Sequence, residues 1–408
     1  MTKKISGEKN KTILENQTFT EPVRISDCEN CQIVNCDFSS NESEKAMLHL
    51  SDCRGCTVSK CKFHDKDTVG VALKIDGEKT KDNIVEDCEW WDLSYDEGNG
   101  GEPVRLGNSR VSHLIYNTIV RRCSFKNLKA DAETISIKSC GNTIENCKQE
   151  NCKSSFVIRH GHSNTIKDCK FFGEGGIRVY NKDNKIQGNH FRDNHSKDYP
   201  PLTIDYGDTQ NEPFEGTSGS SKGHASYVQV RNNDISGNTF ENCRICVRWG
   251  KKDRKYMPEG VKFHNNKVMA DKVDSVLFEF RHRAKLEGNE GVDNEVAGDK
   301  ARMDSVIALW FRGAQPNTTH PPQNGDGGDG DVEGPKPAGG PDPVTEPPID
   351  TEDLDRLCSI CEATGEGNDA KQKLSISICA EHTPAAREML GQFLTELKAK
   401  EKEKAQEP

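Results

Sequence analysis

A short pattern of hydrophobic and polar positions repeats along the chain as far as residue 289. A hydrophobic residue precedes a Cys or Asn by three positions, and an aromatic or aliphatic side chain follows two positions later. Clear copies occupy 33–38 (IVNCDF), 58–63 (VSKCKF), 85–90 (VEDCEW), 120–125 (VRRCSF), 144–147 (IENC), 166–171 (IKDCKF), 186–191 (IQGNHF) and 235–240 (ISGNTF). Fainter copies include Asn266 and Asn289. Such short alternating runs between Asn, Gly and Asp predict β-strands joined by tight turns.

The Cys or Asn of these copies recurs at steps of 25, 27, 35, 24, 22, 20, 49, 28 and 23 residues. A period near 22–25 residues predicts an all-β protein, a right-handed single-stranded parallel β-helix, in which stacked coils share one core. At the repeated position an Asn amide can form a hydrogen-bonded ladder, and a Cys can pack as a small apolar side chain. The two long steps predict insertions around 89–118 and 192–234, on a face that often binds ligands.

Most of the 17 cysteines fall on repeat positions. The pairs Cys28/Cys31 and Cys53/Cys56 have the spacing of zinc knuckles, but their register with the coils favours stacked core thiols. Residues 1–17 are polar and lack the apolar segment of a secretory signal peptide. We therefore expect free thiols rather than a disulfide framework.

A change of composition divides the chain into three predicted parts. The β-helix is expected to span 1–314, a flexible linker rich in Pro, Gly and Asp 315–350, and a short helical tail 351–408. The tail has a Cys-x2-Cys-x17-Cys-x2-His spacing that resembles a zinc ribbon, although a packing stripe on an amphipathic helix is the favoured explanation of the first two thiols. Those four residues are Cys358, Cys361, Cys379 and His382.

Composition and charge narrow the class of partner. The 408 residues are 32% hydrophobic and 30% charged, with a mean hydropathy of -0.82, and no run of apolar residues is long enough to span a membrane. Residues 316–408 carry the whole net charge of -10, whereas 101–200 hold 17 basic and 10 acidic residues. A cationic stretch in a neutral body is typical of a polyanion-binding surface. No groove-reading helix or aromatic–basic module indicates nucleic acid as that polyanion.

Three stretches place ionisable residues where the repeat calls for apolar or small ones: 96–105, 131–139 and 156–162. Lys138 and Arg159 are 21 residues apart, so we expect them on neighbouring coils, with backbones about 5 Å apart. Asp131 and Glu133 alternate, which predicts that both carboxylates face the same side of one strand. Two carboxylates and a nearby amide oxygen would suit a hard cation such as Ca²⁺.

These stretches resemble polysaccharide lyase family six, which includes alginate lyases and dermatan-cleaving chondroitinase B. The resemblance lies in E-x-I-S-I-K-S, N-x-x-x-N-C, I-R-H-G and G-G-I-R-V-Y, and it is densest from residue 99 to 189. It implies that Lys138 is the catalytic base and that Arg159 acts at the leaving group. It also implies Ca²⁺ ligands and residues that line the sugar groove. The implied ligands are Asn99, Asp131 and Glu133, and the implied groove residues are His160, Arg178 and Tyr180.

Position 131 departs from the family pattern, because an Asp stands where a Glu is usual, and this shortens the reach to a metal. The implied reaction is β-elimination from a uronate. A Ca²⁺ on the substrate carboxylate would stabilise the negative charge that develops when the C5 proton is removed. Lys138 must then be neutral near pH 7, which Ca²⁺, Arg159 and partial burial would all favour.

The leading interpretation is therefore a calcium-dependent lyase of an extracellular anionic polysaccharide, with alginate preferred to dermatan sulfate. A β-helical glycoside hydrolase is a second interpretation, with Asp205 and Asp208 as its nearest pair of carboxylates. A third is a non-catalytic polysaccharide-binding β-helix, such as a virion attachment protein. Replacement of Lys138 by Ala separates the first from the third, because binding would survive while lyase activity would vanish.

Overall fold

The computed structural model describes residues 2–95, 99–129, 131–211, 226–250, 254–281, 286, 288–302, 307 and 310–312. The chain divides into two compact units, Met1–Asn317 and Thr318–Pro408. The predicted linker and helical tail, with the four candidate zinc ligands, lie outside the described residues. No helix among the described residues is long and apolar enough to cross a membrane.

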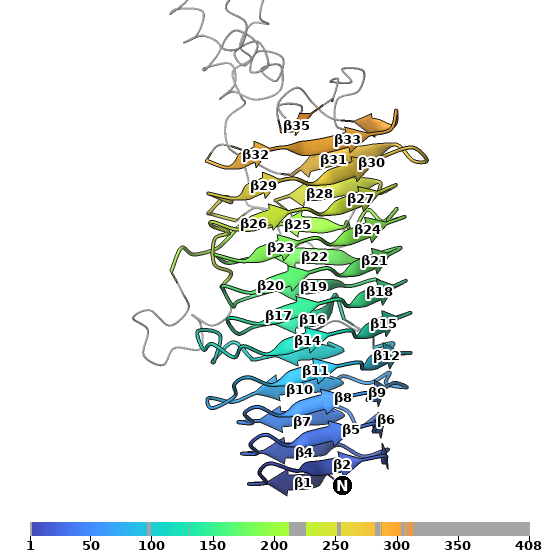
Figure 1. Ribbon diagram of the computed structural model, residues 1–408, viewed down its shortest axis with the longest axis vertical. Helices are drawn as coiled ribbons and strands as arrows, with labels where there is room; N and C mark the ends of the chain where they lie inside the picture. Colours follow the sequence, from blue (N-terminus) through green and yellow to red (C-terminus); the bar gives the residue numbers. More distant parts are fainter. Residues whose placement is uncertain are drawn as a thin grey trace, which may run out of the picture. The chain divides into compact units, whose positions relative to one another are not determined.

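The described strands form three parallel sheets, and the chain visits each sheet once per coil (Figure 1). The first sheet carries the candidate site. Its strands, in spatial order, are β1 (Lys3–Ser6), β4 (Val23–Ser26), β7 (Leu48–Ser51), β10 (Leu73–Asp76), β13 (Val104–Leu106), β16 (Glu133–Ile137), β19 (Ser155–Ile158), β22 (Gly176–Val179), β25 (Leu202–Ile204), β28 (Ile245–Trp249), β31 (Ser275–Phe280) and β34 (Ala301–Arg302).

The second sheet contains the hydrophobic residue that opens each copy of the sequence pattern. Its strands are β2 (Thr12–Glu15), β5 (Gln32–Val34), β8 (Thr57–Ser59), β11 (Ile84–Glu86), β14 (Ile119–Arg121), β17 (Thr143–Glu145), β20 (Thr165–Lys167), β23 (Lys185–Gln187), β26 (Asp234–Ser236), β29 (Lys262–His264) and β32 (Glu290–Val292).

The third sheet contains the residue that closes each copy, which is aromatic in most of them. Its strands are β3 (Thr18–Phe19), β6 (Asp37–Phe38), β9 (Lys62–Phe63), β12 (Glu89–Trp91), β15 (Ser124–Lys126), β18 (Lys148–Glu150), β21 (Lys170–Phe172), β24 (His190–Arg192), β27 (Thr239–Glu241), β30 (Lys267–Met269), β33 (Asn294–Ala297) and β35 (Phe311–Arg312). The predicted parallel β-helix is confirmed, and each strand pairs with its counterpart in the next coil.

The repeated residues form continuous rows through the core. Aromatic rings stack from coil to coil, with Phe38 and Trp90 each about 5 Å from Phe63 between them, at 5.0 and 4.9 Å. This packing of identical positions on one another lets a coil that cannot fold alone bury its apolar side chains against its neighbours.

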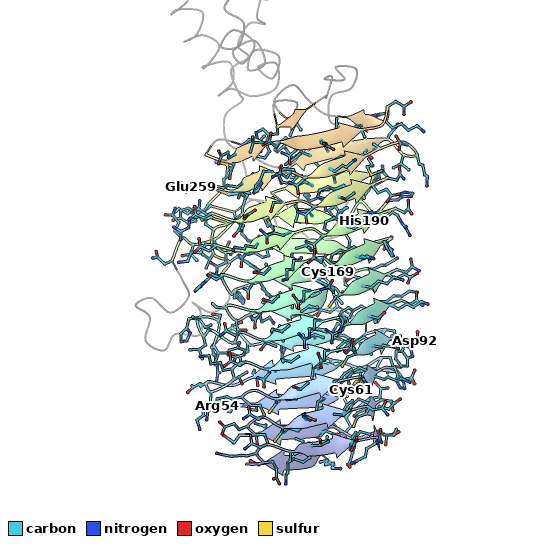
Figure 2. All side chains as sticks on the ribbon, in the orientation of Figure 1. Arg54, Cys61, Asp92, Cys169, His190 and Glu259 are labelled. Carbon is cyan, nitrogen blue, oxygen red and sulfur yellow. The ribbon has the colours of Figure 1, made fainter. Side chains whose placement is uncertain are left out.

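Thiols and amides occupy the turn between the second and third sheets. Cys36, Cys61, Cys88, Cys123, Cys147 and Cys169 follow one another in this row, and each is at most 2% exposed. Figure 2 shows Cys61 and Cys169 within the stack of coils, whereas Arg54, Asp92 and Glu259 lie at its margins. All fourteen cysteines among the described residues are buried free thiols. They include Cys28, Cys31, Cys53 and Cys56, so the two knuckle-like pairs are core thiols.

Asparagines continue this row where the cysteines stop. The side-chain amide of Asn189 donates to Asn238, that of Asn238 to Asn266, and that of Asn266 to Asn294, at 2.9–3.0 Å. The last member is thus Asn294 rather than Asn289, whose side chain accepts from the backbone of Val261 in a different turn. A buried amide that bonds to the next coil keeps its polar atoms satisfied, as the repeat predicts.

Candidate active site

The candidate site lies on the first sheet, where β13, β16, β19 and β22 are neighbours. Ile137 at the end of β16 pairs with Ile158 at the end of β19, and Lys138 and Arg159 come directly after them. The backbone N–H of Arg159 donates to the carbonyl of Ile137 at 2.8 Å. Lys138 and Arg159 therefore hold equivalent positions in adjacent coils, the arrangement indicated by their spacing in the sequence.

Lys138 is buried against a carboxylate. Its Nζ lies 3.3 Å from Oε1 of Glu102, and the two side chains are 9% and 1% exposed. Burial lowers the pKa of Lys138 most strongly; the charge of Glu102 opposes this effect, and the charge of Arg159 adds to it. A lysine whose pKa is lowered in this way has a larger neutral fraction, which is the form that can accept a proton.

Glu133 joins two arginines from successive coils. Its Oε1 accepts hydrogen bonds from Arg159 at 3.1 Å and from Arg178 at 2.9 Å, and its Oε2 accepts one from Ser136. Burial raises the pKa of Glu133, but the two guanidinium charges outweigh burial and the pKa is lowered overall. Glu133 is therefore an ionised counter-charge that orients both arginines.

Asp131 precedes β16, which begins at Glu133, so the two carboxylates do not alternate along one strand as predicted. The Oδ2 of Asp131 accepts from the backbone N–H groups of Gly100 and Gly101 at 2.8 and 3.3 Å, and its Oδ1 accepts from that of Glu133 at 3.1 Å. Burial and, next, the charge of Glu102 raise the pKa of Asp131. Asp131 thus fastens the loop before β13 to the start of β16.

Asn99 is exposed on that loop, and Glu102 is the acidic side chain that reaches the site. Glu102 does not stand out in the sequence, because the length of the insertion leaves open which residue of 96–105 faces the cluster. The signal was present in the Pro at 103, which directly precedes β13 and fixes Glu102 two residues before the strand.

The donor set fits Ca²⁺ in its chemistry. Glu102, Asp131 and Glu133 offer carboxylate oxygens only, and Oε2 of Glu102 is buried without a hydrogen-bond partner. The charge of Glu102 contributes to the raised pKa of Asp131, because the two carboxylates repel each other. A cation bound between the carboxylates would relieve this repulsion. Within the described ranges, no three His, Cys, Asp or Glu side chains already converge as a metal cluster, and Glu133 is turned to its arginines.

His160, Arg178 and Tyr180 lie around a residue that the sequence analysis did not select, Tyr227. The Tyr227 ring stacks on His160 at 5.7 Å and lies 4.2 Å from the ring of Tyr180, and the guanidinium of Arg159 lies 5.7 Å from its centre. Burial, followed by the charge of Arg159, lowers the pKa of His160 to about 3. His160 is therefore neutral at ordinary pH. Tyr227 lies within the second insertion, whose path no local pattern in the sequence specifies.

Asp205 and Asp208, the pair considered for a hydrolase, share one guanidinium. Arg254 lies 3.2 Å from a carboxylate oxygen of each, and Tyr180 donates its hydroxyl to Asp205 at 2.7 Å. Asp205 is fully buried. Two carboxylates held by the same arginine lack the separate acid and base environments that glycoside hydrolysis needs.

Several polar atoms of this site are buried but have no hydrogen-bond partner among the residues that the structure describes. Buried polar atoms are normally paired, so a group of unpaired ones marks a place prepared for a polar ligand. The atoms are Oε2 of Glu102 and Nε of Arg105, Nε of Arg159 and of Arg178, and Nδ1 of His160.

The chain matches the model of one known protein family. Residues 6–262 match the family model described as Chondroitinase B. This range contains Glu102, Asp131, Glu133, Lys138 and Arg159. No curated protein sequence matches the chain.

Three solved structures share the fold and cover 76% of this chain. One is a mannuronic acid specific polysaccharide family 6 lyase from human gut microbiota, at 19% identity, TM-score 0.53 and 84% of its own length. A second is an alginate lyase of the same family in complex with a trisaccharide, at 16%, 0.58 and 81%. A third is the alginate lyase AlyF-OU02 in complex with G6, at 15%, 0.55 and 82%.

Proposed function

The chain belongs to the chondroitinase B family of polysaccharide lyases, and we propose that it cleaves alginate by calcium-dependent β-elimination at the cluster around Lys138. The observation that carries the proposal is the buried Lys138, whose pKa is lowered, beside Arg159 at the equivalent position of the next coil. The neutral form of this amine, which a lowered pKa makes more populated, suits proton removal from a carbon beside a carboxylate when fixed positive charges lie next to it.

In the proposed reaction Lys138 accepts the C5 proton of the uronate. The electrons of that C–H bond form the C4–C5 double bond, and the C4–O4 bond breaks. Water supplies the proton to the departing O4, because the guanidinium of Arg159 keeps its own protons. The cleaved chain then carries a 4,5-unsaturated sugar at its new non-reducing end.

The two arginines hold the substrate carboxylate in this scheme. Glu133 orients both guanidinium groups, and the Nε of each is buried without a partner and so has a hydrogen to donate. Paired guanidinium donors bind a carboxylate with defined geometry and favour its more negative, enolate-like state. Binding in this way also presents the C5 proton to Lys138.

Calcium, when bound, would supply a Lewis acid that further neutralises the substrate carboxylate. Glu102 and Asp131 are the residues that would hold it, with Glu133 as the third carboxylate. Asn99, the ligand implied by the family resemblance, is exposed, and we propose Glu102 in its place. This assignment also gives the unpaired Oε2 of Glu102 a partner.

The name of the matching family model favours a second candidate substrate, dermatan sulfate. Three solved structures with the same fold, a mannuronic acid specific lyase and two alginate lyases, favour alginate. The test is ultraviolet absorbance of the unsaturated product on each polymer separately, with Ca²⁺ and with a chelator. We expect a rise on alginate that the chelator abolishes. A rise on dermatan sulfate alone overturns the substrate, and a rise that persists with chelator overturns the calcium requirement. No rise on either polymer overturns the lyase.

A further inference from the structure

A row of basic side chains, four of them lysine or arginine and one a histidine in contact with Asp76, runs along the first sheet from the candidate site towards β1. Strand register pairs each with the next, so they stand one per coil on the same line. They are Lys4, Arg24, His49, Lys74 and Arg105. The row joins the catalytic cluster directly, because Arg105 pairs with Ser136 of β16 and lies 3.7 Å from Glu102.

The cationic row lines a groove. Its five members border a cavity of about 540 Å³ on the outer face of the first coils. The carboxylates closest to the row lie beneath it: Asp76 is 9% exposed against 24% for Lys74, and Glu102 is 1% exposed against 21% for Arg105. Lys4 and Arg24 are exposed. The surface offered to a ligand is therefore cationic, with Glu44 as an acidic neighbour at the rim.

Hydroxyl groups accompany the positive charges. Ser6, Ser26 and Ser51 form the neighbouring row of the same strands, in register from β1 to β7. The hydroxyl of Ser26 donates to that of Ser6 at 3.1 Å, and Arg24 donates to Ser51 at 3.5 Å. A row of cations beside a row of hydroxyls matches a polymer that carries both carboxylates and sugar hydroxyls.

On the other side of the catalytic cluster, the basic side chain on the same line is covered by protein. Beyond Arg178 it continues through Thr203 to Arg248, which is 1% exposed. Arg248 donates to Glu279 and to the backbone carbonyls of Lys197 and Asp198, so the loop before β25 covers it. Open positive charge is thus found on the β1 side of the cluster, among the residues that the structure describes.

We propose that the five side chains from Lys4 to Arg105 form a binding track for an extended polyuronate, which holds several sugars on one side of the scissile bond. This proposal rests on the proposed function, since it names how the same site takes a long substrate. Neighbouring coils are about 4.8 Å apart. A pyranose unit advances its chain by a similar length, so successive carboxylates can meet successive coils.

The test measures binding rather than activity. In the Lys138→Ala background, calorimetry gives the Kd of a mannuronate trimer and of a decamer. We expect the decamer to bind about tenfold more tightly than the trimer, and added salt to reduce the difference because it screens exposed charges. The further double substitution Lys4→Gln with Arg24→Gln should remove about fivefold or more of the decamer affinity and leave the trimer within about twofold.

A matched control removes the same charge from another face. Lys185 and Lys262 are exposed lysines of the second sheet, and Lys185→Gln with Lys262→Gln should leave both affinities unchanged. Equal affinity of trimer and decamer overturns the track, as does an equal loss in the control. Failure of both oligomers to bind instead overturns alginate as the substrate. The two proposals therefore fail by different results.

Discussion

The ammonium nitrogen of Lys138 lies 3.3 Å from Oε1 of Glu102, across 36 residues of chain that include a whole coil. The contact exists because β13 and β16 are neighbours in the first sheet. It places a carboxylate where it can attract the proton that a base must take up, while burial lowers the pKa of the amine.

Replacement of Lys138 by Ala should reduce kcat by about 10²–10⁴-fold or more, because no other described group stands in for the base. Binding of an oligouronate, measured by calorimetry, should remain. Lys148→Ala, which removes a half-exposed lysine of the third sheet, is the control and should retain full activity. Residual activity of Lys138→Ala near that of the control would show that the proton goes elsewhere.

Glu102→Gln should weaken Ca²⁺ binding by at least about tenfold, since it removes one carboxylate charge from the proposed ligands. Asn99→Ala should leave the affinity unchanged, because Asn99 is exposed on the loop. Direct titration with Ca²⁺ in the absence of substrate measures both. Weaker Ca²⁺ binding by Asn99→Ala, with unchanged binding by Glu102→Gln, would instead identify Asn99 as the ligand.

Oligouronates should also protect the candidate site from heat. A ligand that binds only the folded protein raises the free energy of unfolding with the logarithm of its concentration, by about 2.7 kcal/mol at one hundred times Kd. We expect the Tm of the Lys138→Ala protein to rise with decamer concentration. Arg178→Gln should lose this rise, because it removes one of the two guanidinium groups that Glu133 orients. An undiminished rise would place the sugar away from Arg178.

The stability of the first coils should depend on pH through Lys66. This side chain donates to the carbonyl of Glu42 and the hydroxyl of Thr68, and burial lowers its pKa to about 8. The unfolded chain holds that proton up to about pH 10.5, so stability rises between pH 8 and 10.5. Between pH 7 and 10 the wild type should gain about 2–3 kcal/mol over Lys66→Met. Parallel pH curves in urea unfolding would contradict this.

The thiol rows should be inert in the folded protein. All fourteen described cysteines are buried, and Cys358, Cys361 and Cys379 lie outside the described residues. At most three of the 17 thiols should therefore react with an aromatic disulfide reagent over minutes, and all should react in denaturant. Rapid reaction of more than three would show that coils open.

The repeat itself allowed the coils, the stacked thiols and the asparagine ladder to be predicted, because each depends on residues within one period. The neighbouring positions of Lys138 and Arg159 could be predicted for the same reason. The spacing of the isoleucines that precede them sets the register between β16 and β19. Residues that are one period apart in the sequence become neighbours across the sheet. The period alone is therefore enough to predict which residues stack.

Glu102 and Tyr227 could not be predicted in this way, because each is delivered by an insertion. The path of a long loop depends on what it packs against, such as the bonds from Gly100 and Gly101 to Asp131. Asp131 shows a related effect: it precedes β16, which begins at Glu133, so the alternation assumed from the sequence does not extend to it. The acidic composition of residues 1–100 likewise conceals the cationic row, which only strand register reveals.

The number of residues from one coil to the next varies from 20 to 49, and this has a consequence for how such a chain can change through evolution. The strands remain paired across every step, so residues gained or lost in a loop leave the vertical alignment of all later coils intact. One residue gained inside a strand would instead turn its side chains to the opposite face. Loops can therefore diversify freely while the line of functional side chains is inherited unchanged.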